Sequence, residues 1–276
     1  MQSVSCTGHG LFSGVQATLT LRPAEAGSGI VFQRTDLPGR PCVTAVFQNV
    51  VSTPRCTILG TSQFVVQTVE HLLSALKAYR IDNALIEISG PEVPIFDGSA
   101  LPFAELIERA GICDLEKMRP SYYLETPYVW TQKEDIYVMA LPSDELRFSY
   151  TLHYPNSSLL KTQCYSFTQG QDCFLEEMAP ARTFCLYEEI APLIEKGLVK
   201  GGLGNGVVIK GDQVMNPEGL RFPDEMVRHK VLDLIGDLSL IPHDFTAHII
   251  AIRSGHAANI AFASELVKHL KMEKAV

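Results

Sequence analysis

The stretch PDEMVRHKVLDLIGDLSL (residues 223–240) has the pattern of an amphipathic helix with chemistry on its polar side. Apolar side chains recur at helical spacing along one side, at Val227, Val231, Leu234, Ile235 and Leu238. His229, Asp233 and Asp237 follow at i, i+4 and i+8 on the opposite side. His-x3-Asp is a workable half of a zinc site, because imidazole and carboxylate both bind zinc and adjacent turns bring them together. The alternative is a solvated helix face, and the pattern alone favours that alternative.

A second stretch, TVEHLLSALKA (68–78), predicts another amphipathic helix. Its apolar stripe consists of Val69, Leu72, Leu73 and Leu76. Glu70 and His71 lie away from this stripe, so they need water or a partner surface. A histidine beside a glutamate could supply a third metal ligand and a base, with the fourth zinc position left for a water. Taken alone, a solvated pair explains them better.

Outward from these helices, the chain mixes strands and helices in both halves. The first half predicts strands at 15–21, 29–33 and 83–88 and a helix at 102–110 that ends at Gly111. The charged segment 114–121 contains Arg119-Pro120 and separates the halves, so we predict two domains, residues 1–117 and 121–276. The second half predicts strands at 122–130, 135–141, 147–153, 206–210 and 248–253, and helices at 173–178, 187–196, 223–240 and 259–270.

Length and composition exclude several classes of protein. The chain has 276 residues, 46% of them hydrophobic, so it can form a sizeable core. Its net charge of -8 and lack of basic runs disfavour nucleic acid as a partner. No segment approaches the roughly 20 apolar residues of a membrane span, and no secretory signal begins the chain. We therefore expect a soluble cytoplasmic protein. The seven scattered cysteines predict free thiols.

Two further segments have candidate roles. SGHA (254–257) follows a predicted strand and places His256 on a turn, where catalytic groups are common, although a lone loop histidine is more often solvated. GGLGNG (201–206) has the glycine content of a phosphate-binding loop, but it fits neither common motif and leads into a strand. It predicts a tight backbone turn.

Six strings occur together and in order: TGHGLFSG (7–14), TVEHLLSAL (68–76), IDNALIEISGPEVPIFDGSA (81–100), ARTF (181–184), GLRFPDEMVRHKVLDLIGDLSL (219–240) and SGHA (254–257). Together they resemble the zinc-dependent UDP-3-O-acyl-N-acetylglucosamine deacetylases of lipid A synthesis. The resemblance runs from about residue 3 to residue 270.

The resemblance implies roles for individual residues. The zinc ligands would be His71, His229 and Asp233, with a water in the open position. The catalytic residues would be Glu70 as general base, His256 as general acid, Asp237 as its hydrogen-bond partner, Thr183 beside the oxyanion and Lys230 near the substrate.

The resemblance also implies a fold and a specificity element. The fold would be α+β, with two domains, each a β-sheet layered with α-helices, and an active site at the domain interface. An insert near 184–202 would form a passage for the substrate's acyl chain, lined by Leu186, Ile190, Leu193, Ile194 and Leu198. A helix that merely faces the core is the alternative for this stripe.

Two departures from the family pattern stand out. Phe12 replaces the usual histidine of the first motif, with His9 three residues earlier. The 201–206 loop is one residue shorter than in the family and lacks its aspartate. Neither touches the expected metal ligands.

The expected activity is therefore hydrolysis of the acetamide of UDP-3-O-acyl-N-acetylglucosamine, giving UDP-3-O-acyl-glucosamine and acetate. The alternatives are an enzyme for another acylated amino sugar and a metal-free sugar-nucleotide binding protein. We expect a monomer that acts on a small molecule, with peripheral membrane association left open. Acyl-chain length and the choice of zinc or iron are also open.

Overall fold

The computed structural model describes residues 2–132, 134–195 and 203–272. Its first large sheet is built from the N-terminal third of the chain, in the order β1-β2-β8-β3-β4. Only β3 and β8 pair in parallel among these strands; the other neighbours are antiparallel. The strands are β1 (Val4–His9), β2 (Gln16–Pro23), β8 (Ala84–Ile88), β3 (Ile30–Arg34) and β4 (Cys42–Thr44).

The second large sheet is built from residues after 120. Its main path is β10 (Tyr128–Gln132), β11 (Ile136–Leu141), β17 (Asp244–Ile252), β12 (Leu146–Tyr154) and β13 (Lys161–Thr168). β9 (Ser121–Leu124) pairs with β17, and β18 (Leu270–Met272) pairs with β9. The two large sheets share no strand, which agrees with the α+β fold class. The exact boundary at 117 and 121 stays a prediction.

The remaining strands form two smaller sheets, one antiparallel and one mixed. One contains β5 (Val50–Ser52), β6 (Ile58–Gly60) and β7 (Val65–Val66). The other contains β14 (Phe184–Leu186), β15 (Val207–Lys210) and β16 (Gln213–Val214). The first of these matters for the site, because it leads directly to α1.

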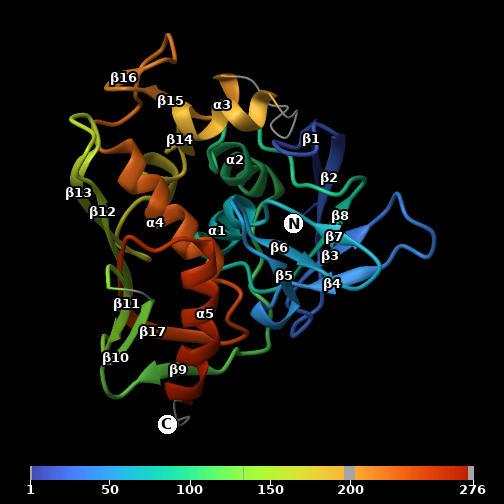
Figure 1. Cartoon of the computed structure of the whole chain (residues 1–276). Coiled ribbons are helices and arrows are strands. Elements are labelled where there is room, and N and C mark those ends of the chain that lie inside the picture. The colour runs from blue at the N-terminus through green and yellow to red at the C-terminus, as the bar shows by residue number, and fades with distance from the viewer. Residues whose placement is uncertain (1, 133, 196–202, 273–276) are drawn as a thin grey trace.

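The helices that pack on the two large sheets lie between them (Figure 1). α2 (Leu101–Ala110) packs on β1 and on α1 (Glu70–Ala78), whereas α4 (Glu225–Leu238) and α5 (His256–Leu266) pack on the second sheet. α1 and α4 pack against each other, so these two helices join the halves of the chain. The remaining helical segments are α3 (Tyr187–Glu195), η1 (Phe47–Asn49), η2 (Phe174–Met178), η3 (Leu203–Asn205) and η4 (Val267–His269).

The helices predicted by periodicity at 68–78, 102–110 and 223–240 are confirmed as α1, α2 and α4. Others are shifted. The predicted strand 122–130 is divided into β9 and β10, and the predicted helix 173–178 is a single π-helical turn. α5 begins at His256 and not at 259, because Gly255 takes an extended conformation and Ala257 and Ala258 continue the helix. His256 therefore lies in the first turn of a helix, not on a turn as predicted.

Some strands were missed in the sequence. β13 is one of them, and most of its side chains are polar or partly exposed because it lies at the edge of its sheet. β4 to β7 are too short to show a period. Within the described residues, no helix combines the length and apolar character needed to cross a membrane.

The close approach of α1 and α4 depends on Gly236. A Cβ at this position would lie 2.1 Å from the backbone carbonyl oxygen of Glu70, far inside contact distance. Alanine normally stabilises a helix interior relative to glycine by about 1 kcal/mol, so a helix glycine here needs a packing reason. That reason is the backbone of the facing helix.

We expect Gly236→Ala to lower the free energy of unfolding by about 1–3 kcal/mol or more, because the added methyl group forces α1 away from α4. Denaturant unfolding measures the change. Gly204→Ala is the matched control, since a Cβ there meets nothing within 4 Å. Equal stability of the two variants would contradict the packing argument.

Candidate active site

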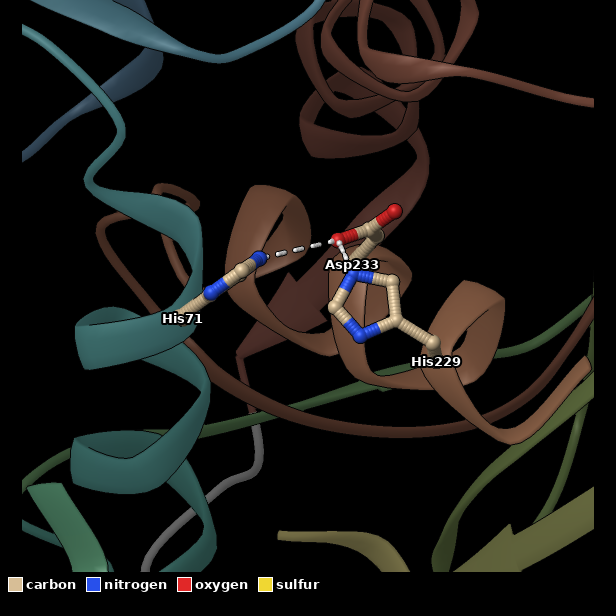
Figure 2. Close-up of side chains that lie close together, drawn as sticks. All are labelled: His71, His229 and Asp233. Carbon is tan, nitrogen blue, oxygen red and sulfur yellow. Dashed lines mark ion pairs between the residues drawn. The ribbon is translucent and has the colours of Figure 1, made fainter. Parts of the chain in front are cut away.

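α1 and α4 bring three predicted metal ligands to one point. His71 comes from the first turn of α1, and His229 and Asp233 come from successive turns of α4 (Figure 2). Their ligand atoms all lie within 4.8 Å of one another. Oδ1 of Asp233 is 3.2 Å from Nε2 of His229 and 3.8 Å from Nε2 of His71. The solvated-face alternatives are wrong, because these side chains are at most 6% exposed.

Hydrogen bonds determine which atoms of His229 and Asp233 are free to face one another. The backbone carbonyl of Ala181 lies 3.0 Å from Nδ1 of His229 and accepts its proton, so a neutral His229 has its lone pair on Nε2. Lys230 donates to Oδ2 of Asp233 at 2.7 Å, which leaves Oδ1 facing both imidazoles. In this form, Nε2 of His229 faces a carboxylate oxygen with its lone pair.

Electrostatics agree with a cation at this point. Burial lowers the pKa of His71 to about 3, so His71 is neutral. Burial opposes ionisation of Asp233, but the ammonium group of Lys230 outweighs it and holds the pKa of this carboxyl well below its usual range. Nε2 of His229 is buried without a hydrogen-bond partner among the described residues. Lone pairs and an anionic oxygen in one buried place repel one another unless a cation lies between them, so the set fits a divalent metal.

Glu70 lies next to the ligands and is almost fully buried. Its Oε2 accepts a hydrogen bond from the backbone N–H of Thr57 at 3.0 Å. Its Oε1 is 3.9 Å from Nε2 of His256. Burial raises the pKa of Glu70 to about 7, although the neighbouring His256 works in the opposite direction. This carboxyl can therefore take up and release a proton near neutral pH.

His256 forms a buried pair with Asp237. Its Nδ1 is 2.9 Å from Oδ2 of Asp237. Asp237 also accepts hydrogen bonds from Oγ1 of Thr57 at 2.5 Å and Nδ2 of Asn259 at 2.8 Å, so both of its oxygens are fixed. Burial alone would lower the pKa of His256, but the carboxylates of Asp237 and Glu70 raise it to about 10. His256 is thus a cation at neutral pH.

Lys230 and Thr183 are less directly placed. Lys230 is bound to Asp233, and this carboxylate raises the pKa of the ammonium although burial opposes it. Thr183 is held by its backbone, which donates to Gly98 at 2.8 Å and accepts from Val207 at 2.7 Å. Its hydroxyl makes no hydrogen bond to the three ligands, all of which the structure describes. The oxyanion role of Thr183 stays a prediction.

Several residues that shape the site had no signal in the sequence. Thr57 and Asn259 are ordinary polar residues in sequence, and only the fold brings them to Asp237. Arg182 is a partial exception, because it lies in the ARTF string. It is 2% exposed and pairs with the buried carboxylate of Glu225 at the start of α4. This pair fixes the chain beside Ala181, the partner of His229.

The two departures in the sequence occur at positions other than the three ligands. Phe12 donates its backbone N–H to the buried Glu92 at 3.0 Å, and Ser13 does so at 2.7 Å, so this carboxylate holds the first-motif loop. In the 201–206 loop, Gly201 and Gly202 lie outside the described residues, and Leu203–Asn205 forms η3.

The insert predicted near 184–202 stays a prediction, and the structure describes only part of this region. β14 and β15 pair in parallel, and α3 follows β14. Residues 196–202 and the side chains of residues 192–195 lie outside the described part of the chain, so Leu193, Ile194 and Leu198 carry no finding. The acyl passage stays a prediction.

Comparisons with known proteins agree with the geometry and confirm the resemblance seen in the six motifs. The family model of LpxC, UDP-3-O-acyl N-acetylglycosamine deacetylase, matches residues 1–268. A UDP-3-O-acyl-N-acetylglucosamine deacetylase from Chlamydia pneumoniae is 47% identical over 273 residues, which cover 98% of this chain and 96% of the relative. Relatives with the same name from Chlamydia felis and Chlamydia muridarum are both 46% identical, over 271 and 274 residues, covering 98% and 99% of this chain and 96% and 95% of their own lengths. The chain belongs to the LpxC family of UDP-3-O-acyl N-acetylglycosamine deacetylases.

Proposed function

We propose that this protein hydrolyses the acetamide of UDP-3-O-acyl-N-acetylglucosamine, giving UDP-3-O-acyl-glucosamine and acetate, in lipid A biosynthesis. Membership of the family and the names of the relatives support the substrate. The observation that carries the chemistry is the meeting of a His2Asp metal set with Glu70 and a protonated His256 in one buried centre. A protein that only binds a sugar nucleotide has no need of this combination.

We propose zinc as the metal and His71, His229 and Asp233 as its ligands. Two neutral imidazoles and one carboxylate are a common catalytic zinc set that leaves a position open. When bound, zinc supplies a Lewis acid and lowers the pKa of a coordinated water to about 7. Iron is the chemical alternative at such a set.

Glu70 would act as the general base. Thr57 holds Oε2, so Oε1 is the oxygen available to take a proton from the attacking water. The new bond forms between the water oxygen and the acetamide carbon. Thr183 is proposed to stabilise the oxyanion that results, and Lys230 is proposed to lie near the substrate while it neutralises Asp233.

His256 would act as the general acid. Its Nε2 points toward Glu70 and carries the proton that the leaving nitrogen needs. Donation of this proton accompanies cleavage of the C–N bond, so the products are acetate and a free amine. Asp237 fixes the orientation of the ring through Nδ1 and keeps it protonated.

The rate should follow a bell-shaped pH profile. Glu70 acts when deprotonated, so kcat/KM should fall as the pH drops through its pKa, which is about 7 without metal. His256 acts when protonated, so kcat/KM should fall again as the pH rises through its pKa, which is about 10 without metal. A bound dication lowers both values. His256→Gln should lose the alkaline limb, and an unchanged alkaline limb in this variant would show that another group is the acid.

The function is tested by acetate release from the purified protein. UDP-3-O-acyl-N-acetylglucosamine should yield acetate, whereas UDP-N-acetylglucosamine without the acyl chain should react far more slowly. Rates across acyl lengths then give the preferred chain, since each buried CH₂ contributes only about 0.8 kcal/mol. Metal-replete protein that acts on neither substrate would reject the proposal and favour another acylated amino sugar. Action in the cytoplasm and a monomeric state stay predictions.

A further inference from the structure

Thr57 is the one described residue that hydrogen-bonds to both the proposed base and the proposed acid pair. It lies directly before β6 and is fully buried. Its backbone N–H donates to Oε2 of Glu70 at 3.0 Å. Its hydroxyl donates to Oδ1 of Asp237 at 2.5 Å. Glu70 belongs to α1 and Asp237 to α4, so Thr57 connects the two helices at the point where their chemistry meets.

The hydroxyl of Thr57 fixes the orientation of the Asp237 carboxylate. Oδ2 of this carboxylate already accepts hydrogen bonds from His256 and Asn259. Oδ1 accepts from Thr57, which prevents rotation of the carboxylate about its last torsion. Without this donor, the buried Oδ1 loses its partner, and a buried charged acceptor left unpaired is costly. Rotation toward another donor would weaken the bond that orients His256.

The backbone N–H of Thr57 fixes the orientation of the Glu70 carboxylate. It engages Oε2 and leaves Oε1 directed at His256, 3.9 Å away. The carbonyl of Thr57 also accepts the N–H of Val69 at 3.4 Å, which fixes Thr57 against the start of α1. The separation of base and acid therefore depends on one residue from a third element.

We propose that Thr57 is a positioning residue that sets the geometry between the general base Glu70 and the general acid pair Asp237–His256. This inference rests on the proposed function. It predicts that loss of the hydroxyl slows the chemical step and spares substrate and metal binding, because Thr57 bonds to neither the ligands nor an open surface.

Thr57→Val tests the hydroxyl, since valine keeps the shape of threonine. We expect kcat to fall by about 10- to 100-fold with KM within about twofold and one bound metal retained. Thr57→Ser restores the donor and should recover kcat to within about threefold of the unaltered protein. Thr18→Val is the matched control, because it removes a hydroxyl bonded to Thr7 on an exposed strand face and should leave kcat unchanged.

Each other result has a definite meaning. If the unaltered protein releases no acetate, the proposed function fails before Thr57 is tested. If it does, and Thr57→Val retains its kcat or changes only KM, the positioning role is rejected. Equal losses in the serine and valine variants would also reject it. Thr57→Ala is a second test, because it removes the hydroxyl without placing a methyl group against Asp237. If neither the valine nor the alanine variant folds, Thr57 contributes to stability alone and the positioning role is rejected.

Discussion

His229→Ala is expected to lose its bound metal and, with it, nearly all deacetylase activity. His229 supplies the unpartnered Nε2 that faces Oδ1 of Asp233, so its removal leaves His71 and Asp233 as a two-residue set. Lewis-acid stabilisation supplies several kcal/mol to the transition state, and about 4 kcal/mol corresponds to a rate loss of about 10³-fold. Metal analysis of the purified variant and initial rates of acetate release measure the two effects.

His269→Ala is the control for this substitution. His269 is exposed on η4 and stacks on Tyr128, so its removal should change neither metal content nor rate. A His229→Ala protein that keeps one tightly bound metal and normal activity would show that the centre between α1 and α4 is not the metal site.

Glu70→Gln is expected to lower kcat by about 10²- to 10⁴-fold, the usual contribution of a general base. Glutamine keeps the size of the side chain and can still accept the N–H of Thr57 through its amide oxygen. It cannot take a proton from water. KM and metal content should therefore change little, and the loss should appear in single-turnover acetate release as well as in steady-state rates.

Glu105→Gln provides the comparison, because this carboxylate is exposed on α2. It should behave as the unaltered protein. If Glu70→Gln lost metal in proportion to activity, Glu70 would be a support for the ligands and not the base. If it retained full activity, the base would be another group.

The helices and the proposed metal ligands on α4 could be predicted from the sequence, because both follow from the spacing of residues. His229 and Asp233 are one turn apart on a strongly periodic segment, so their common face could be predicted from residue numbers alone. The surface that packs against this face could not be predicted in the same way. The same pattern predicts a solvated face equally well, and only the packing of α1 on α4 makes it a buried centre.

The residues that hold the site residues in place could not be predicted from the sequence, for a different reason. Thr57 and Asp237 are 180 residues apart in sequence, and Ala181 acts on His229 through a backbone carbonyl that any residue has. The role of Gly236 depends on the distance between two helix backbones. The motif resemblance predicts which side chains react, but tertiary contacts of this kind leave no periodic trace in one sequence.

The start of α5 shows how a local pattern can mislead. The sequence predicts a turn at SGHA, because this segment follows a predicted strand. In the structure, Tyr150 donates a hydrogen bond to the carbonyl of Ser254, and the helix begins immediately after Gly255. His256 is therefore fixed by a helix and a neighbouring strand, which suits its proposed role as the general acid.

Chelation followed by metal replacement tests the central claim most directly. Purified protein is stripped of metal and assayed for acetate release from UDP-3-O-acyl-N-acetylglucosamine, then assayed again after one equivalent of zinc is restored. The account predicts loss of activity on stripping, recovery at one zinc per chain, and no recovery in His229→Ala. Full activity in protein shown to be free of metal would contradict it.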